Sequence, residues 1–267
     1  KDIDIALFSA GGKVSEKFAP IAASKGVIVV DNSSQWRMDE TVPLVVPEVN
    51  PEDIKKNNGI ISNPNCSTIQ AMVPLKPLHD KYKIKRIVYS TYQAVSGSGV
   101  KGIEDLKNGL AGNDTTNAYH HPIAGNCIPQ IDVFTENGYT KEEMKMINET
   151  HKILNDNSIR VTATTVRVPV FDSHSESVNL EFEKPFKLDE LVGVLKNAKG
   201  VVVCDDIKHN IYPLARDVTG KDEVYVGRIR RDFSVDNGVN LWIVADNIRK
   251  GAATNTVQIA EELLKLL

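Results

Sequence analysis

The first 34 residues hold the feature that most restricts the fold of this chain. Two short apolar runs, over residues 3–10 and 27–34, enclose a stretch with helical spacing over 13–26. Short apolar runs bounded by glycines are typical of buried strands. Two strands joined through a helix lie parallel in a sheet. The pattern therefore predicts a parallel, Rossmann-like α/β sheet.

The helix over 13–26 should turn one apolar side toward this sheet. That side is expected to consist of Val14, Phe18, Ile21 and Ala22. A further strand is expected within 59–65. It runs into a helix over 66–82, which Pro74 and Pro77 should shorten or kink.

From residue 86 onward the pattern is that of a different domain. Apolar and polar residues alternate over 159–170 and 176–185, as in half-buried antiparallel strands. Two more strands are expected over 222–234 and 238–247, joined at Asp-Asn-Gly, a hairpin signal. Helices are predicted around these strands, over 100–110, 140–155 and 188–198. The sequence thus predicts a second, mixed domain built on an antiparallel sheet.

The last stretch, 251–267, predicts a helix with one apolar face. Such a face must cover a sheet, so the helix is expected to return to the first domain. We therefore expect an incomplete Rossmann-like domain over 1–66, completed by 246–267, and a second domain over 67–245.

Composition excludes several classes of protein. The net charge is −3, and the only basic cluster is the short stretch 228–232, so nucleic-acid binding is not expected. No apolar run is long enough to span a membrane. The three cysteines are widely spaced, which favours a reducing cytoplasm over a disulfide framework. No C-x-x-C pair or other ligand cluster indicates a metal site.

Cys66 differs from the other two cysteines, Cys127 and Cys204, which suit small apolar packing positions. It follows an Asn-Pro-Asn turn and opens a helix among polar residues. Because a helix N-terminus stabilises a thiolate, we expect a lowered thiol pKa and a nucleophilic role. His174 is the candidate partner, since Arg167 lies seven residues before it on the incoming strand. An arginine there could bind a carboxylate bidentately.

Two further features are ambiguous when taken alone. The stretch 96–99, Ser-Gly-Ser-Gly, is either a flexible loop or a close approach of backbone to a ligand. Glu142 and Lys145 share one helix face and would ordinarily form a solvent-exposed ion pair.

Together these segments resemble one family. Five stretches carry the likeness: SNPNCSTIQ (62–70), TYQAVSGSG (91–99), 128–154, RVPVFDSHSESV (167–178) and 245–261. In their order and spacing they resemble the aspartate-β-semialdehyde dehydrogenases over the whole chain. The resemblance implies NADPH-dependent reduction of β-aspartyl phosphate to aspartate semialdehyde, a step in biosynthesis of lysine, methionine and threonine.

The resemblance also implies a role for each candidate residue. Cys66 would form a thioester, which phosphate cleaves in the reverse direction, and His174 would be the acid/base. Gln93 would orient the substrate, Arg167 would hold its carboxylate and Glu142 its amino group. Phosphate would be bound by Arg37, Lys145 and Asn65. The NADP contacts would be Ser9, Ala10, Gly11, Gly12, Ser96, Gly97 and Asn247.

One departure from the family pattern lies at the start of the chain. The family begins with a strand and a G-x-x-G-x-x-G turn that holds the pyrophosphate, whereas this sequence starts at Lys1, beyond that turn. We therefore expect a missing N-terminal segment and weak or absent NADP binding and activity in this chain alone. A homodimer is expected, with a tetramer as the other possibility. Two alternatives remain: a related acyl-phosphate reductase, or a catalytically incompetent fragment that serves as a dimerisation or binding module.

Overall fold

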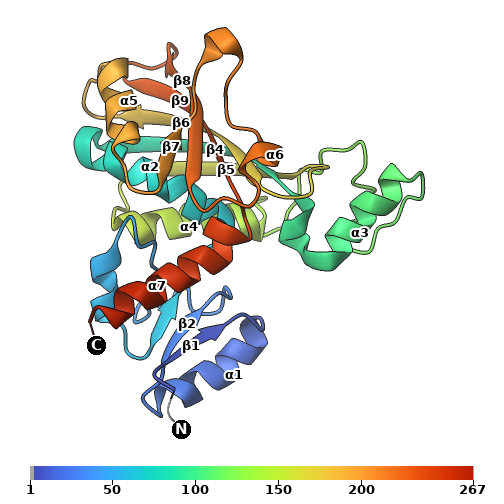
Figure 1. Ribbon diagram of the computed structural model, residues 1–267, viewed down its shortest axis with the longest axis vertical. Coiled ribbons are helices and arrows are strands. Elements are labelled where there is room, and N and C mark those ends of the chain that lie inside the picture. The colour runs from blue at the N-terminus through green and yellow to red at the C-terminus, as the bar shows by residue number, and fades with distance from the viewer. Residues whose placement is uncertain (1–2, 267) are drawn as a thin grey trace.

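Two β-sheets organise the chain, and Figure 1 shows them at opposite ends of the molecule. The computed structural model describes residues 3–266. The smaller sheet has three parallel strands in the order β1-β2-β3. These strands are β1 (Ile5–Phe8), β2 (Ile28–Asp31) and β3 (Ile60–Ser62). The predicted Rossmann-like parallel sheet is thereby confirmed. Within residues 3–266, β1 is an edge strand.

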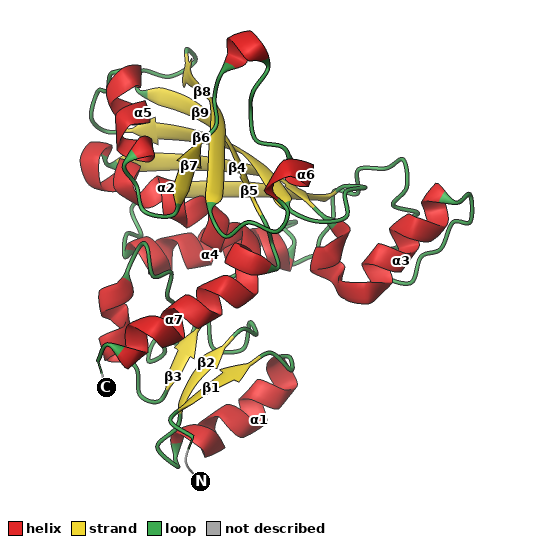
Figure 2. Ribbon diagram, in the orientation of Figure 1, coloured by secondary structure: helices red, strands yellow, loops and turns green. Residues whose placement is uncertain are grey.

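Helices cover both faces of the small sheet, as Figures 1 and 2 show. On one face lies α1 (Gly12–Ala23). On the other lies α7 (Thr254–Leu264), which contacts β2 and the short helix η1 (Pro51–Lys56). The core under α7 consists of Val30, Val45, Ile54, Ile61, Ile259 and Leu263. The last helix therefore packs on the first sheet, as its apolar face predicts.

The apolar side expected for α1 is confirmed only at Ala22, which is half-buried against the core of Ala19, Val29, Val42 and Ile60. Ser15 and Ala19 are the buried residues of α1, whereas Phe18 and Ile21 are 45% and 53% exposed. Small side chains let the helix lie close to the strands, and a Cβ on Gly59 would be only 2.8 Å from that of Ala23. Helical periodicity identified an apolar stripe, but the side of α1 that packs on the sheet is the one that carries the small residues Ser15 and Ala19.

The larger sheet has six strands in the order β5-β4-β6-β9-β8-β7. They are β4 (Ile84–Gln93), β5 (Arg160–Arg167), β6 (His174–Phe182), β7 (Val201–Val203), β8 (Val224–Asp232) and β9 (Gly238–Ala245). The β8–β9 hairpin is confirmed, and the central pairings are antiparallel. The two outer strands depart from this pattern, because β5 runs parallel to β4 and β7 parallel to β8. Alternation of apolar and polar residues indicates that one face of a strand is buried, but it does not indicate the direction of the neighbouring strand. The expectation that β5 is antiparallel to its neighbour was therefore wrong.

Helices pack on one face of this sheet. They are α2 (Cys66–Tyr82), α4 (Lys141–Leu154) and α5 (Leu188–Lys196). The helix α2 runs unbroken for 17 residues through Pro74 and Pro77, so the expectation of a shortened helix was wrong. Its apolar side chains, including Leu75 and Leu78, are fully buried. That burial offsets the hydrogen bonds that the two prolines remove.

The remaining elements connect or flank these helices and strands. They are η2 (Val95–Ser98), α3 (Gly99–Leu110), η3 (Ile207–His209), α6 (Ala215–Val218) and the π-helix η4 (Arg249–Ala253). Figure 1 shows α3 projecting away from the rest of the molecule. A small core of its own, which includes Val95, Leu106 and Ile123, holds it to the loop that follows.

Candidate active site

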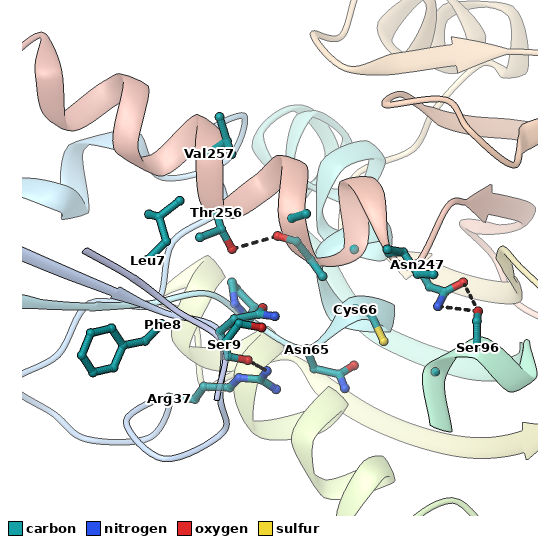
Figure 3. Close-up of a pocket in the computed structure, with 17 residues that line it drawn as sticks. Leu7, Phe8, Ser9, Arg37, Asn65, Cys66, Ser96, Asn247, Thr256 and Val257 are labelled. Atoms are coloured by element: carbon teal, nitrogen blue, oxygen red, sulfur yellow. Dashed lines mark hydrogen bonds between the residues drawn. The ribbon is translucent and has the colours of Figure 1, made fainter. Parts of the chain in front are cut away.

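A cavity of about 540 Å³ opens beside Cys66, between the small sheet and the ends of the larger one. Figure 3 shows Cys66 among side chains from widely separated parts of the chain, including Ser9, Arg37 and Asn247. Cys66 is the first residue of α2, directly after the Asn-Pro-Asn turn that ends β3. Asn65 caps the helix, because its side-chain oxygen accepts hydrogen bonds from Ser67 N (3.0 Å) and Thr68 N (3.3 Å).

The expected lowering of the Cys66 thiol pKa is wrong for this state of the site. Burial raises the pKa of Cys66 to about 12, and the nearby carboxylate of Glu142 adds to the effect. Arg167, Arg37 and a backbone N–H act in the opposite direction without outweighing the burial. The sulfur sits at a helix N-terminus, as predicted, but in surroundings that favour the neutral thiol.

His174 begins β6 and is fully buried. Its Nδ1 accepts a hydrogen bond of 3.0 Å from the backbone N–H of Ala94. Its Nε2 is buried without a hydrogen-bond partner. Burial, and next the charge of Arg167, hold the pKa of this imidazole well below its usual range. The ring is therefore neutral.

Arg167 ends β5, next to the end of β4, because the two strands are parallel. Its Nη1 donates to the carbonyl of Ala94 at 2.6 Å, while its buried Nε has no partner. Gly97 brings the two predicted groups together. A Cβ there would lie 2.8 Å from Arg167 Nη1 and 3.3 Å from His174 Nε2. Only glycine leaves both side chains in place, which gives the Ser-Gly-Ser-Gly stretch a structural reason.

Glu142 gathers three of the predicted residues around one buried carboxylate. One oxygen accepts from Asn65 Nδ2 (2.9 Å) and Gln93 Nε2 (3.2 Å), and the other from Lys145 Nζ (3.2 Å). Lys145 also donates to Asp132 at 2.9 Å. Burial alone would lower the pKa of Lys145, but these two carboxylates raise it above its ordinary value. The pair is thus half-buried, with Glu142 on its buried side, rather than a fully solvent-exposed contact.

Arg37 is held by a partner that the sequence did not reveal. Its Nη1 donates to Glu149 at 3.2 Å, and its other nitrogens donate to the carbonyls of Asn63 and Asn32. Glu149 also accepts from the backbone N–H of Asn65 at 2.7 Å. Burial raises the pKa of Glu149, and Arg37 opposes that shift. Glu142 and Glu149 are seven residues apart on one helix face, a spacing that could have indicated Glu149.

The predicted cofactor contacts divide into two groups. Ser9, Ser96, Gly97 and Asn247 line the cavity, whereas Ala10, Gly11 and Gly12 do not. Asn247 Nδ2 donates to Ser96 Oγ at 3.1 Å, as Figure 3 shows. Asn247 Oδ1 also accepts from Ser173 N at 2.9 Å.

The sequence did not reveal the far wall of the cavity, which is formed by the π-helix η4 and the start of α7. Its residues are Ile248, Gly251, Ala252, Ala253, Thr256 and Val257. Gly251 lies directly against the cysteine, because a Cβ there would be 2.9 Å from Cys66 Cβ. This wall is mainly apolar, with Thr256 as its only polar side chain, and it therefore suits an apolar or aromatic group laid beside the sulfur.

Within residues 3–266, no helix is long and apolar enough to cross a membrane. In the same residues, no group of three or more His, Cys, Asp or Glu side chains is gathered to hold a metal ion.

Comparison with known proteins bears on what this cavity does. Residues 1–57 match the family model described as semialdehyde dehydrogenase, NAD binding domain, and residues 75–250 match its dimerisation domain. The chain is 59% identical to aspartate-semialdehyde dehydrogenase of Aquifex aeolicus, covering 99% of this chain and 80% of that protein. The chain belongs to the aspartate-semialdehyde dehydrogenase family. It is accordingly an oxidoreductase with a nicotinamide-binding domain.

Solved structures of the family have the same fold. The chain superposes on aspartate semialdehyde dehydrogenase II from Vibrio cholerae with a TM-score of 0.95 and 53% identity, covering 98% of this chain and 80% of that one. A second structure of that Vibrio enzyme is a complex with ASA. The Candida albicans enzyme, solved with NADP, has a TM-score of 0.78 at 28% identity and covers 98% of this chain and 77% of that one.

Proposed function

We propose that the protein interconverts β-aspartyl phosphate and aspartate semialdehyde through a thioester on Cys66. Family membership supports the reaction, and one observation supports the assignment of the nucleophile. Cys66 lies at the N-terminus of α2, and it borders the cavity that Gly97 and Asn247 also line. A buried structural cysteine would have no need of either feature.

Substrate recognition is assigned to two protein side chains of opposite charge, one for each charged group of an amino acid. Arg167 has an unpartnered buried Nε and binds the α-carboxylate, and Glu142 binds the ammonium group. Gln93, already bonded to Glu142 through its amide N–H, orients the substrate with its free carbonyl oxygen. An amino acid with a short side chain matches this pair of charges. In a related acyl-phosphate reductase for a substrate without an amino group, Glu142 would have Lys145 as its only cationic partner among residues 3–266.

Phosphate binding falls to Arg37 and Lys145, with Asn65 beside them. A guanidinium has five N–H donors, and Arg37 uses three of them within the protein. An ammonium has three, and Lys145 uses two. Donors therefore remain on both side chains for phosphate oxygens.

The dinucleotide is proposed to be NADP, held at its nicotinamide end by Ser96, Gly97 and Asn247, and by the 9–12 turn along its length. Bound there, it supplies or accepts the hydride. The Ser96–Asn247 hydrogen bond fixes both side chains on the cavity wall before any ligand binds. The apolar wall formed by η4 and α7 keeps water from the reacting carbon.

We further propose a cytoplasmic homodimer, with a tetramer as the alternative, and retain the domain boundary near residue 66. The outer face of the large sheet offers a surface for a second copy. Tyr92 and Trp242 lie there with ring centroids 5.5 Å apart, beside a shallow pocket of about 420 Å³. Aromatic residues of this kind are enriched in interfaces.

The test is NADP reduction with aspartate semialdehyde, with phosphate supplied or withheld, in the wild type and in Cys66→Ala. Phosphate-dependent turnover that disappears in Cys66→Ala supports the proposal. Turnover with an aldehyde that lacks the amino group would favour the related acyl-phosphate reductase. A folded dimer with no turnover and no cofactor binding would favour the binding-module alternative for this chain.

A further inference from the structure

We propose that Lys152 is a positioning residue for phosphate binding, because it ties the loop over residues 37–42 to α4 and so holds Arg37 in place. This inference rests on the proposed function and adds to its phosphate site a residue that does not touch phosphate. The 37–42 loop lies between β2 and β3 of the small sheet, whereas α4 packs against β5 of the larger sheet. Lys152 therefore joins the two halves of the proposed site.

The ammonium group of Lys152 lies among three main-chain carbonyls of this one loop. It donates to Arg37 O at 2.7 Å, to Asp39 O at 2.7 Å and to Val42 O at 2.8 Å. An ammonium has three N–H donors, so none remains for a ligand. Lys152 also does not line the cavity beside Cys66. Any effect of this side chain on the site is therefore transmitted by the loop.

The loop is closed by hydrogen bonds of its own. Asp39 Oδ1 accepts from Thr41 N at 2.8 Å and from Thr41 Oγ1 at 2.7 Å. Val42 N donates to Asp39 O at 3.2 Å. Because these bonds join near neighbours in the chain, they fix the shape of the loop but not its place relative to α4. The three bonds from Lys152 supply that connection, and one of them is made to the residue that carries the guanidinium.

One face of α4 holds both parts of Arg37. Glu149 accepts from its guanidinium at 3.2 Å, and Lys152, three residues further along the helix, binds its main-chain oxygen. Lys145, the other proposed phosphate-binding cation, precedes Glu149 by four residues on the same face. At a rise of about 1.5 Å per residue, Lys145 and Lys152 are about 10 Å apart along the helix. A rigid helix thus determines where the two phosphate-binding cations lie relative to each other.

A positive charge suits this position. Partial burial lowers the pKa of Lys152, and the carboxylates of Asp39, Glu149 and Glu40 oppose that shift. Main-chain carbonyls that are removed from water need a hydrogen-bond partner. If the ammonium were replaced by an apolar group, the loop would have to turn these carbonyls toward solvent. Such a movement would carry the backbone of Arg37 with it.

The first test needs no turnover and uses Lys152→Met, which keeps most of the unbranched side chain and loses the three donors. Hydrogen exchange followed by mass spectrometry should show faster exchange of the amides over 37–42, with β2 unchanged. Calorimetric titration with inorganic phosphate should give a Kd that is about tenfold higher, as expected from the loss of one hydrogen bond to a charged group. Unchanged exchange in the loop, or an unchanged Kd, would overturn the proposal.

Lys56→Met is the matched control. Lys56 lines the same surface pocket as Lys152, but its ammonium pairs with Asp53 and not with the 37–42 loop. The substitution therefore removes the same charge from the same region and leaves the loop contacts intact. We expect the exchange rates and the phosphate Kd to stay at their wild-type values. A rise in Kd equal to that of Lys152→Met would show that only overall charge matters, and would overturn the proposal.

The second test asks whether Lys152 acts through Arg37. Once Arg37→Met has removed the guanidinium, adding Lys152→Met should weaken phosphate binding no further, whereas two independent contributions would add. In turnover of the semialdehyde, Lys152→Met should raise the phosphate KM about tenfold and change the semialdehyde KM by less than about twofold. Urea unfolding shows whether each variant is folded. Additive losses, or an equal rise of both KM values in a folded variant, would overturn the proposal.

The same measurements separate this inference from the function on which it rests. Weaker phosphate binding in Arg37→Met but not in Lys152→Met would contradict the positioning role and leave the proposed phosphate site intact. Phosphate binding that is unchanged in Arg37→Met would contradict the proposed site and this inference together.

Discussion

The side-chain amide of Asn65 donates a hydrogen bond of 2.9 Å to Glu142, and the next residue after Asn65 is Cys66. The residue that caps the catalytic helix is thereby tied to the carboxylate proposed to bind the substrate's ammonium group. The same carboxylate raises the pKa of the Cys66 thiol. Substrate recognition and the protonation of the nucleophile therefore share one side chain, because an ammonium bound to Glu142 would neutralise the charge that disfavours the thiolate.

Glu142→Gln should lower the thiol pKa of Cys66. Removing a negative charge favours the thiolate, and a shift of one pKa unit changes its population about tenfold. We expect alkylation of Cys66 near neutral pH to accelerate about 3- to 10-fold while the KM for the semialdehyde rises. The measurement is the iodoacetamide rate against pH, followed by peptide mapping to separate Cys66 from Cys127. An unchanged or slower rate in the variant would contradict this coupling.

Gly251→Ala should impair catalysis without unfolding the protein. Its Cβ would lie 2.9 Å from Cys66 Cβ and 3.4 Å from Cys66 Cα, so the nucleophile must move. A displacement of about 1 Å can cost about 10²-fold in rate, and we expect kcat to fall by about 10- to 100-fold. Gly193→Ala is the matched control, because a Cβ there meets nothing within 4 Å. Equal activity of the two variants would show that Cys66 tolerates the shift.

Arg37→Met should destabilise the fold as well as weaken phosphate binding. It would leave Glu149, which is 1% exposed, without its cation. Breaking a buried ion pair from one side costs about 3–5 kcal/mol. Adding Glu149→Gln should recover part of that loss, because the uncompensated charge is then removed. Urea unfolding of the two single variants and the double variant measures the coupling, and strictly additive losses would contradict the pairing.

Glu176→Gln should change how stability depends on pH. The Glu176 carboxyl lies on β6, fully buried, with neither oxygen hydrogen-bonded within residues 3–266, and burial raises its pKa well above the ordinary value. The folded protein therefore keeps a proton that the unfolded chain loses. The stability linked to that proton is present at low pH and is lost as pH rises toward the folded-state pKa.

Glutamine has no proton to lose, so the free energy of unfolding of Glu176→Gln should increase relative to the wild type as pH rises from about 4.5. Urea midpoints at several pH values measure the difference. Glu183→Gln, at an exposed position just after the same strand, should show no such trend. A difference that shrinks with pH would contradict the assignment.

Local patterns predicted the parts of the site that depend on chain neighbours. The Asn-Pro-Asn turn placed Cys66 at the first residue of a helix, and the alternating pattern placed Arg167 on the strand that precedes His174. The features that sequence did not reveal depend on tertiary contacts. Glu149 belongs to the site because it binds Arg37, which is 112 residues away in the sequence. Gly251 belongs to it because its backbone lies directly against Cys66.

The thiol pKa was misjudged for the same reason. The helix N-terminus can be read from local sequence, but burial and the position of Glu142 cannot. The parallel pairing of β5 with β4 and the buried side of α1 likewise depend on which neighbour each element meets.

The central claim is that Cys66 carries the acyl group, and intact-protein mass spectrometry tests it most directly. The protein is mixed with aspartate semialdehyde and NADP, first without phosphate and then with it. The account predicts an added aspartyl mass that maps to Cys66, persists without phosphate and disappears when phosphate is added. Reduction of NADP with no adduct on Cys66, or an adduct that persists in Cys66→Ala, would contradict it.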